Sequence, residues 1–121
     1  MDEHQKTREY VRCKDGFTMS VQASAYHYCN PKVSGYNAVY NKVEIGFPTE
    51  YEPLLKNYVE NLNDDTKDFK WTDSVYGWVP AETVALIIAK HGGIIGGDCP
   101  QLGDIVTIPI YNGITKKPHL Y

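Results

Sequence analysis

Residues 74–93, SVYGWVPAETVALIIAKHGG, limit the folds open to this chain more than any other stretch. Pro80 is well placed at the first position of a helix, and Gly92 is a typical helix stop. Between them the apolar side chains form one broad face, and Lys90 and His91 suit the negative end of the helix dipole. The stretch therefore predicts a strand that leads into a helix over residues 80–91. Because a helix with one apolar face must cover another apolar surface, we expect a sheet beneath it.

Four segments have the spacing of strands. Asp15-Gly16 is a strong hairpin signal, so residues 10–12 and 17–24 are predicted to pair across it. Residues 38–47 supply the next strand, and Pro48 ends it. Within residues 75–79, strict alternation predicts Tyr76 and Trp78 on one side of the strand, with Val75, Gly77 and Val79 on the other.

Two further elements have weaker signals. Residues 50–62 have helical spacing of apolar residues, although Pro53 lies in the first turn. Residues 105–111 form a strand pattern, and Asn112-Gly113 predicts a hairpin after it. Pro109 within that strand favours the edge of a sheet, which invites pairing with a second copy, so a homo-oligomer is expected.

These elements predict an α+β fold. The sheet is small and antiparallel, with a meander and a C-terminal hairpin, and one main helix and a second short helix cover it. The length of 121 residues fits a single domain, 1–121, with residues 1–8 expected to be flexible. The glycine-rich residues 91–97 follow a helix end, so they predict a helix stop and a turn and not a phosphate loop.

Charge and composition exclude several classes of protein. The net charge of -3 has no long block of one sign, so duplex nucleic acid is not an expected partner. The longest apolar run is too short to span a membrane, and the polar first residues lack the apolar core of a secretion signal, so we expect a cytoplasmic protein without a membrane partner. Three cysteines, an odd number without paired spacing, favour free thiols.

Metal binding and catalysis have little support in the sequence. His27, Cys29, His91, Cys99 and Cys13 are zinc-ligand types, but only His27 and Cys29 are close in sequence, so no metal and no cofactor is predicted. Cys29 and His91 are the one candidate combination of a nucleophile with a general base, and nothing in the sequence brings the two together. The protein is therefore expected not to be an enzyme.

The unusual feature of the composition is its ten tyrosines. Two of them stand in residues 26–32, YHYCNPK, beside a histidine and a lysine. Aromatic rings beside cations suit a nucleobase and its phosphate, because stacking is tolerant of base identity. The same rings also suit a protein partner or a subunit interface. The candidate ligand-binding residues are those that offer a ring or a cation: Tyr26, His27, Tyr28, Arg12, Lys32, Trp71, Trp78 and His91.

Four segments together resemble a known family. YVRCKDGFTMSVQAS, HYCNPK, VEIGFP and VYGWVPAETVALIIAKHGGI are similar to the pattern of small, mostly uncharacterised proteins encoded by bacteriophages and prophages. The resemblance covers roughly residues 10–95. Residues 96–121 depart from that pattern and are expected to be a C-terminal extension, which adds a strand or an oligomer contact.

The resemblance implies host–virus interaction in the cytoplasm of an infected bacterium, and it brings no catalytic motif. Two hypotheses follow. In the first, the protein sequesters a small nucleotide-like signal of bacterial defence. In the second, it is a protein inhibitor that docks on a host defence enzyme through exposed aromatic residues of the 61–78 region.

Overall fold

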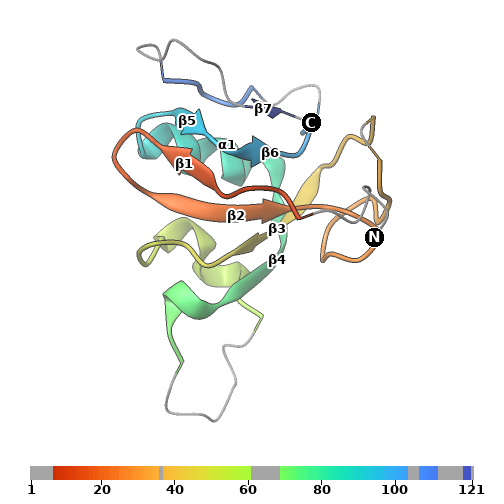
Figure 1. The fold of residues 1–121 in the computed structure, drawn as a ribbon. Coiled ribbons are helices and arrows are strands. Elements are labelled where there is room, and N and C mark those ends of the chain that lie inside the picture. The colour runs from red at the N-terminus through yellow and green to blue at the C-terminus, as the bar shows by residue number, and fades with distance from the viewer. Residues whose placement is uncertain (1–6, 36, 61–68, 104–106, 112–118, 121) are drawn as a thin grey trace.

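The computed structural model describes residues 7–35, 37–60, 69–103, 107–111 and 119–120. Its elements follow one another in a simple order (Figure 1). They are β1 (Val11–Cys13), β2 (Thr18–Gln22), β3 (Lys42–Gly46), the 3-10 helices η2 (Pro53–Tyr58) and η3 (Trp71–Asp73), β4 (Val75–Pro80), α1 (Ala81–Lys90), β5 (Ile94–Gly96), β6 (Asp98–Cys99) and β7 (His119–Leu120).

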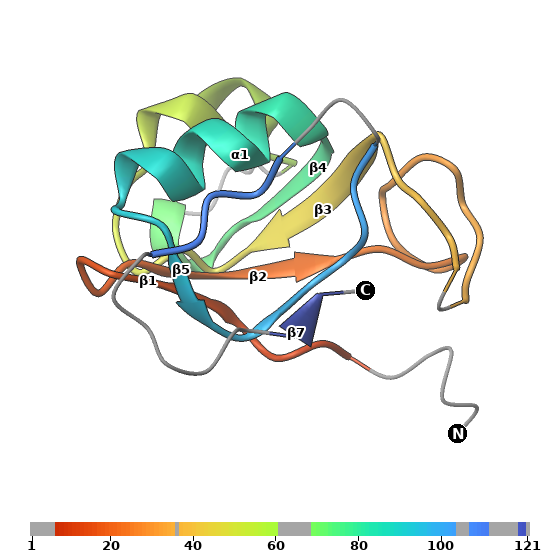
Figure 2. The same ribbon diagram turned by 90° about the horizontal axis from the view of Figure 1, so that it is seen from above.

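The predicted α+β fold is confirmed. Five strands form one sheet in the order β4-β3-β2-β1-β5, and each neighbouring pair is antiparallel. Strands β1 to β4 are the predicted meander, and Asp15-Gly16 turns β1 into β2 as expected. Figure 2 shows α1 and η2 together on one side of this sheet.

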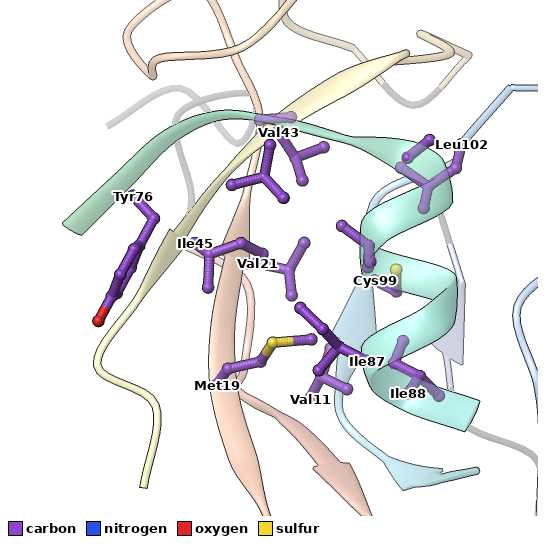
Figure 3. Packing of buried hydrophobic residues seen from close by; sticks show 14 of the residues in the cluster. Val11, Met19, Val21, Val43, Ile45, Tyr76, Ile87, Ile88, Cys99 and Leu102 are labelled. Atoms are coloured by element: carbon purple, nitrogen blue, oxygen red, sulfur yellow. The ribbon is translucent and has the colours of Figure 1, made fainter. Parts of the chain in front are cut away.

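The core lies between α1 and the sheet. Alternate residues of the strands point toward the helix, and its Ile87 and Ile88 point back at them (Figure 3). Val84 of the same helix is also buried. All are fully buried, which is the arrangement that removes most apolar surface from water. The strand residues of this core are Val11, Cys13, Met19, Val21, Val43, Ile45, Tyr76 and Val79.

The second predicted helix is shorter than expected within residues 50–60, the part of its range that the structure describes. Of these, only residues 53–58 are helical, as a 3-10 helix with Glu52 as its N-cap and Pro53 in its first turn. The carboxylate of Glu52 accepts a hydrogen bond from the N–H of Leu54 at 2.8 Å. Glu52 is thereby placed inside the protein, where it has a second role described below.

The glycine-rich residues after α1 include a strand that the sequence did not predict. Gly92 and Gly93 have positive φ values and end the helix, but Ile94–Gly96 then form β5 beside β1. The helix stop is therefore confirmed, and the prediction of a mere turn was wrong beyond it. Backbone hydrogen bonds to β1 stabilise this short segment, which becomes the edge of the sheet.

The C-terminal strand prediction also needs correction. Residues 107–111 are not a strand, and within them only Ile110 makes an isolated bridge, to Ile94 of β5. The N–H of Ile94 donates to the carbonyl of Pro109, and the N–H of Tyr111 donates to the carbonyl of Ile94. Residues 104–106 and the predicted turn at 112–113 lie outside the described residues. Since the predicted edge strand was its basis, the homo-oligomer stays a prediction.

The N-terminal segment was expected to be flexible through residue 8. Arg8 is tied to the end of β2: its N–H donates to the side chain of Gln22, and its guanidinium donates to the carbonyl of Ala23. Residues 1–6 lie outside the described residues. Among the helices that the structure describes, none has the length and apolar character needed to cross a membrane.

Candidate functional site

A bulge in β4 changes where its aromatic side chains point. Val79 pairs with Val43 and Tyr76 pairs with Ile45, so Gly77 and Trp78 together face one residue of β3. Tyr76 is consequently buried, with 1% exposed, whereas Trp78 is 42% exposed. The prediction that these two rings share a side was wrong, because an extra residue in a strand shifts the alternation.

Trp78 has an unusual backbone conformation at this bulge. Its φ is +52°, which is uncommon for any residue but glycine and costs free energy for a bulky one. Its N–H is turned out of the ladder and donates to the carbonyl of Tyr28 at 2.9 Å. The bulge therefore connects β4 to the segment that carries the tyrosines.

The backbone of Tyr28 is also held by β3. Its N–H donates to the carboxylate of Glu44 at 3.1 Å. Two residues later, the N–H of Asn30 donates to the carbonyl of Lys42 at 3.0 Å. With the bond from Trp78, three contacts fix this part of the loop against β3 and β4.

The rings of Tyr28 and Trp78 stack on each other at the protein surface. Their centroids are 4.8 Å apart and their planes differ by 21°. The ammonium of Lys32 lies 5.8 Å from the centroid of the Tyr28 ring, which is within cation–π range. Tyr28 is 41% exposed, similar to Trp78. We call Tyr28, Trp78 and Lys32 the aromatic platform, and three of the predicted ligand-binding residues meet in it.

Gly77 is required beneath the platform. A Cβ atom on Gly77 would lie 2.6 Å from a carboxylate oxygen of Glu60 and 3.1 Å from the Cβ of Tyr28. The N–H of Glu60 donates to the carbonyl of Val75, which keeps this residue beside β4. The absence of a side chain at Gly77 thus lets the Tyr28 segment approach the strand.

Replacing Gly77 by alanine is expected to push Tyr28 away from β4. Glu60 can swing aside, but the Cβ of Tyr28 is held by its backbone, so we expect a loss of about 1 kcal/mol in the free energy of unfolding. Urea unfolding measures it. Gly103→Ala is the matched control, because its added Cβ would meet no atom within 4 Å. Equal stability of both variants would show that Gly77 does not position the platform.

Tyr26 and His27 lie next to the platform in sequence and have different roles. Tyr26 is 69% exposed. The hydroxyl of Ser24 accepts a hydrogen bond from the N–H of Tyr26 and shares a second hydrogen bond, 2.6 Å long, with Nδ1 of His27. Burial lowers the pKa of His27, and the nearby Arg8 lowers it further, against the opposing effect of Glu44. His27 is therefore neutral in this arrangement and a poor partner for a phosphate.

Cys29 and His91, the nucleophile and general base considered from the sequence, bond to other groups and not to each other. The thiol of Cys29 donates to the carbonyl of Ser24 at 3.1 Å, and burial raises its pKa. Both ring nitrogens of His91 bond to other groups. All three cysteines are free and buried. Within the described ranges, no group of three or more His, Cys, Asp or Glu side chains is arranged to hold a metal ion.

Trp71 belongs to a separate cluster. It begins η3, and its ring packs against Tyr51 at 4.8 Å and against Phe69 at 5.0 Å between centroids. Trp71 and Phe69 are both half-buried. Within the predicted 61–78 docking region, Phe69 and Trp71 thus pack on each other, and Trp78 lies in the aromatic platform. Residues 61–68 lie outside the described part of the chain.

His91 is at the centre of a buried charge network. Its Nδ1 lies 2.6 Å from the carboxylate of Asp15 and its Nε2 lies 2.8 Å from that of Glu52. The ring stacks on Phe17 with centroids 4.0 Å apart, and Lys90 reaches the other oxygen of Glu52 at 3.0 Å. Because both nitrogens are used, we remove His91 from the candidate ligand-binding residues.

Asp15, Phe17 and Glu52 were missed as partners of His91. Asp15 and Phe17 stand in the KDGF segment and His91 in the KHGG segment, 76 residues after Asp15. The two segments also share backbone bonds, since the N–H of Lys14 donates to the carbonyl of Gly93. No spacing within the sequence signals that these two segments meet.

The network predicts a specific dependence of stability on pH. Burial opposes the charged form of His91, but hydrogen bonds to Glu52 and Asp15 outweigh it and raise its pKa above the ordinary 6.5. The stabilisation is therefore complete below pH 6.5 and is lost as pH rises through the raised pKa. The pKa values of Glu52 and Asp15 are lowered by hydrogen bonds, so their contribution is lost only as pH falls below their ordinary 4.5 and 3.8.

Urea unfolding of the wild type and of His91→Gln across this range measures the effect. The difference in the free energy of unfolding between the two should be largest between pH 4.5 and 6.5 and should shrink at alkaline pH. A difference that stays constant from pH 5 to pH 9 would contradict a charged His91.

No family model matches the chain, and no curated protein or solved structure matches it.

Proposed function

We propose that this chain is a non-enzymatic binding protein whose aromatic platform takes the base of a nucleotide-type ligand. The observation that carries the proposal is the stacked pair of Tyr28 and Trp78, which are 41% and 42% exposed although large rings gain most by being buried. A planar base that covers an exposed ring gains on the order of 1–3 kcal/mol by stacking.

The rigidity of the platform supports the proposal. Hydrogen bonds with Glu44, Trp78 and Lys42 hold the segment that carries Tyr28. Binding of a ligand therefore requires little further ordering of this segment. The strained φ of Trp78 is retained although a regular strand would avoid it, and such strain concentrates at functional positions. Both features favour a surface that exposes the rings of Tyr28 and Trp78 to a ligand.

Lys32 supports a ligand that is anionic as well as planar. Its ammonium stands beside the Tyr28 ring, and it has no carboxylate partner among the residues that the structure describes. A base on the rings with a phosphate near Lys32 satisfies both. With the resemblance to phage proteins, these features favour sequestration of a nucleotide signal of bacterial defence as the biological role.

The test is isothermal titration calorimetry of the protein with 5′-AMP, 5′-GMP, cyclic dinucleotides, cyclic trinucleotides and cyclic ADP-ribose isomers. We expect saturable binding of at least one of them, with a matching rise in melting temperature. If none binds at ligand concentrations of about 1 mM, the proposal fails.

A protein partner is the second candidate, and one observation favours it. Tyr26 and Val33, in the same loop as Tyr28, are 69% and 44% exposed, so apolar surface continues beyond the rings that a base would cover. Recovery of one stoichiometric bacterial protein on the wild type, and its loss on Tyr26→Ala, would support a docking inhibitor over a nucleotide-binding protein.

A further inference from the structure

One edge of the five-stranded sheet is closed by other parts of the chain. β4 is the strand at this edge. The carbonyl of Val75 accepts a hydrogen bond from the N–H of Glu60, and the N–H of Trp78 donates to the carbonyl of Tyr28. Because these backbone groups already have partners, they are not open to a strand of another molecule.

The opposite edge, β5, is closed by residues 107–111, which we call the strap. Figure 1 shows the strap in blue beside β5. The N–H of Ile94 donates to the carbonyl of Pro109 at 2.9 Å, and the carbonyl of Ile94 accepts from the N–H of Tyr111 at 3.1 Å. Ile110 makes a parallel bridge to Ile94. The strap therefore takes both backbone groups through which Ile94 would bind another strand.

Gly93 lets the strap lie this close to the end of α1. A Cβ atom on Gly93 would lie 2.8 Å from the backbone nitrogen of Tyr111 and 3.1 Å from the carbonyl carbon of Ile110. Ile108 and Ile110 of the strap also pack against the core. The strap thus binds through backbone hydrogen bonds and apolar side chains, as an added strand binds the edge of a sheet.

The attachment of the strap is nevertheless short. Pro109 has no N–H, so it cannot donate a further bond to the ladder. In the part of the chain that the structure describes, the strap makes a single bridge to β5. Its residues are exposed or half-buried, whereas Ile94 is fully buried. Segments with few hydrogen bonds and little buried surface are the ones that open locally.

β5 itself suits pairing with a second copy of the same strand. Its sequence, IIG, has no charged side chain that would oppose the approach of another β5. In an antiparallel pair, two facing residues exchange both hydrogen bonds, so Ile94 of one copy can bond both groups of Ile94 in the other. The exposed Arg12 of β1 lies over Gly96, so the edge of β5 and not this face is where a strand can pair.

We propose that the strap is a releasable cover that keeps the chain monomeric, and that β5 without it pairs with β5 of a second copy. Release leaves the N–H and the carbonyl of Ile94 without partners and uncovers the apolar surface under Ile108 and Ile110. A sheet edge with these features associates. The two copies present the same edge, so a two-fold axis closes the pair as a dimer.

Tyr111→Pro tests the proposal, because it removes the N–H that bonds to Ile94. Tyr111→Ala is the matched control: both variants lose the ring and its cation–π contact with Lys14, and only the alanine keeps the N–H. Size-exclusion chromatography with light scattering gives the mass of the whole chain in solution. We expect wild type and Tyr111→Ala to have the mass of one chain, 13.7 kDa, and Tyr111→Pro to approach twice that mass as its concentration rises.

Amide hydrogen exchange of Ile94 reports whether the strap is in place. It is measured at a low protein concentration, at which the chains are separate. We expect the Ile94 amide to exchange about tenfold faster in Tyr111→Pro than in the wild type, and at the wild-type rate in Tyr111→Ala.

Gly93→Ala releases the strap from the other side, because its Cβ would meet the strap backbone. Gly92→Ala is its matched control. The two glycines have φ values of +96° and +94°, so both alanines carry similar strain, but the Cβ at residue 92 would meet the side chain of Lys14. We expect Gly93→Ala to dimerise and Gly92→Ala to stay monomeric, with circular dichroism to show that both are folded.

A dimeric wild type would overturn the proposal and support the homo-oligomer predicted from the sequence. Faster exchange of Ile94 in Tyr111→Pro without any rise in mass would show that the uncovered edge does not pair, and the proposal would fail. Unchanged exchange in Tyr111→Pro would show that the two hydrogen bonds do not hold the strap, which also contradicts it. Dimers of Tyr111→Pro and Gly93→Ala, with both controls monomeric, would support it.

Discussion

Replacing His91 by alanine is expected to lower the free energy of unfolding by about 3 kcal/mol, because it removes the partner of one oxygen of the buried carboxylate of Glu52. Glu52 is 1% exposed and would keep only Lys90 and the N–H of Leu54. The variant also loses the stacking contact with Phe17, whose ring is fully buried. Urea or guanidinium unfolding monitored by tryptophan fluorescence measures the change.

Lys90→Gln is the matched control for this prediction. Lys90 bonds to the same carboxylate of Glu52, but its side chain is 47% exposed, so the pair is screened by solvent and its loss should cost less than about 1 kcal/mol. If Lys90→Gln and His91→Ala are equally destabilising, the stability of this network depends on a cation beside Glu52 and not on the buried position of His91.

Replacing Trp78 by alanine is expected to weaken binding of a nucleotide-type ligand by about 2 kcal/mol, which is close to thirtyfold in Kd. The variant removes one ring of the stacked pair while the backbone bond from residue 78 to Tyr28 can remain. Calorimetric titration of wild type and variant with the same ligand measures the change.

Tyr51→Ala is the control for Trp78→Ala. Tyr51 is 42% exposed, as Trp78 is, but it packs against Trp71 and not in the platform. Loss of affinity in Tyr51→Ala with none in Trp78→Ala would move the binding surface to the Trp71 cluster.

The main elements could be predicted from the sequence because their signals are local. Asp15-Gly16 can form a tight turn by itself, and Pro80 and Gly92 bracket α1 without help from the rest of the fold. The alternation of residues 17–24 predicted that Met19 and Val21 face the core, where they are fully buried, but it did not predict that Ser20 and Gln22 on the other side are buried as well.

The errors arose where distant residues decide the conformation. β5 exists because β1 offers it hydrogen bonds, and nothing within Ile94–Gly96 signals that partner. The bulge at Trp78 depends on Tyr28, fifty residues earlier, accepting the N–H that the bulge releases. Alternation alone could therefore not reveal that Tyr76 and Trp78 face different surroundings.

The candidate site divides in the same way. Residue type and proximity in sequence predicted Tyr28 and Lys32 together, and the fold adds Trp78 to them. His91 was chosen as a surface cation, yet the fold buries it between two carboxylates whose positions 15 and 52 could not be linked to 91 by spacing. Composition cannot distinguish a ring or a cation offered to a ligand from one used within the protein.

The indole N–H signals of the two tryptophans test most directly whether the platform binds a foreign molecule. The chain has only Trp71 and Trp78, so a proton–nitrogen NMR spectrum gives one indole signal for each, and single substitutions assign them. During titration with 5′-AMP or a cyclic trinucleotide, we expect the Trp78 signal to shift and that of Trp71 to stay in place. A saturable shift of Trp71 with an unmoved Trp78 would contradict the account.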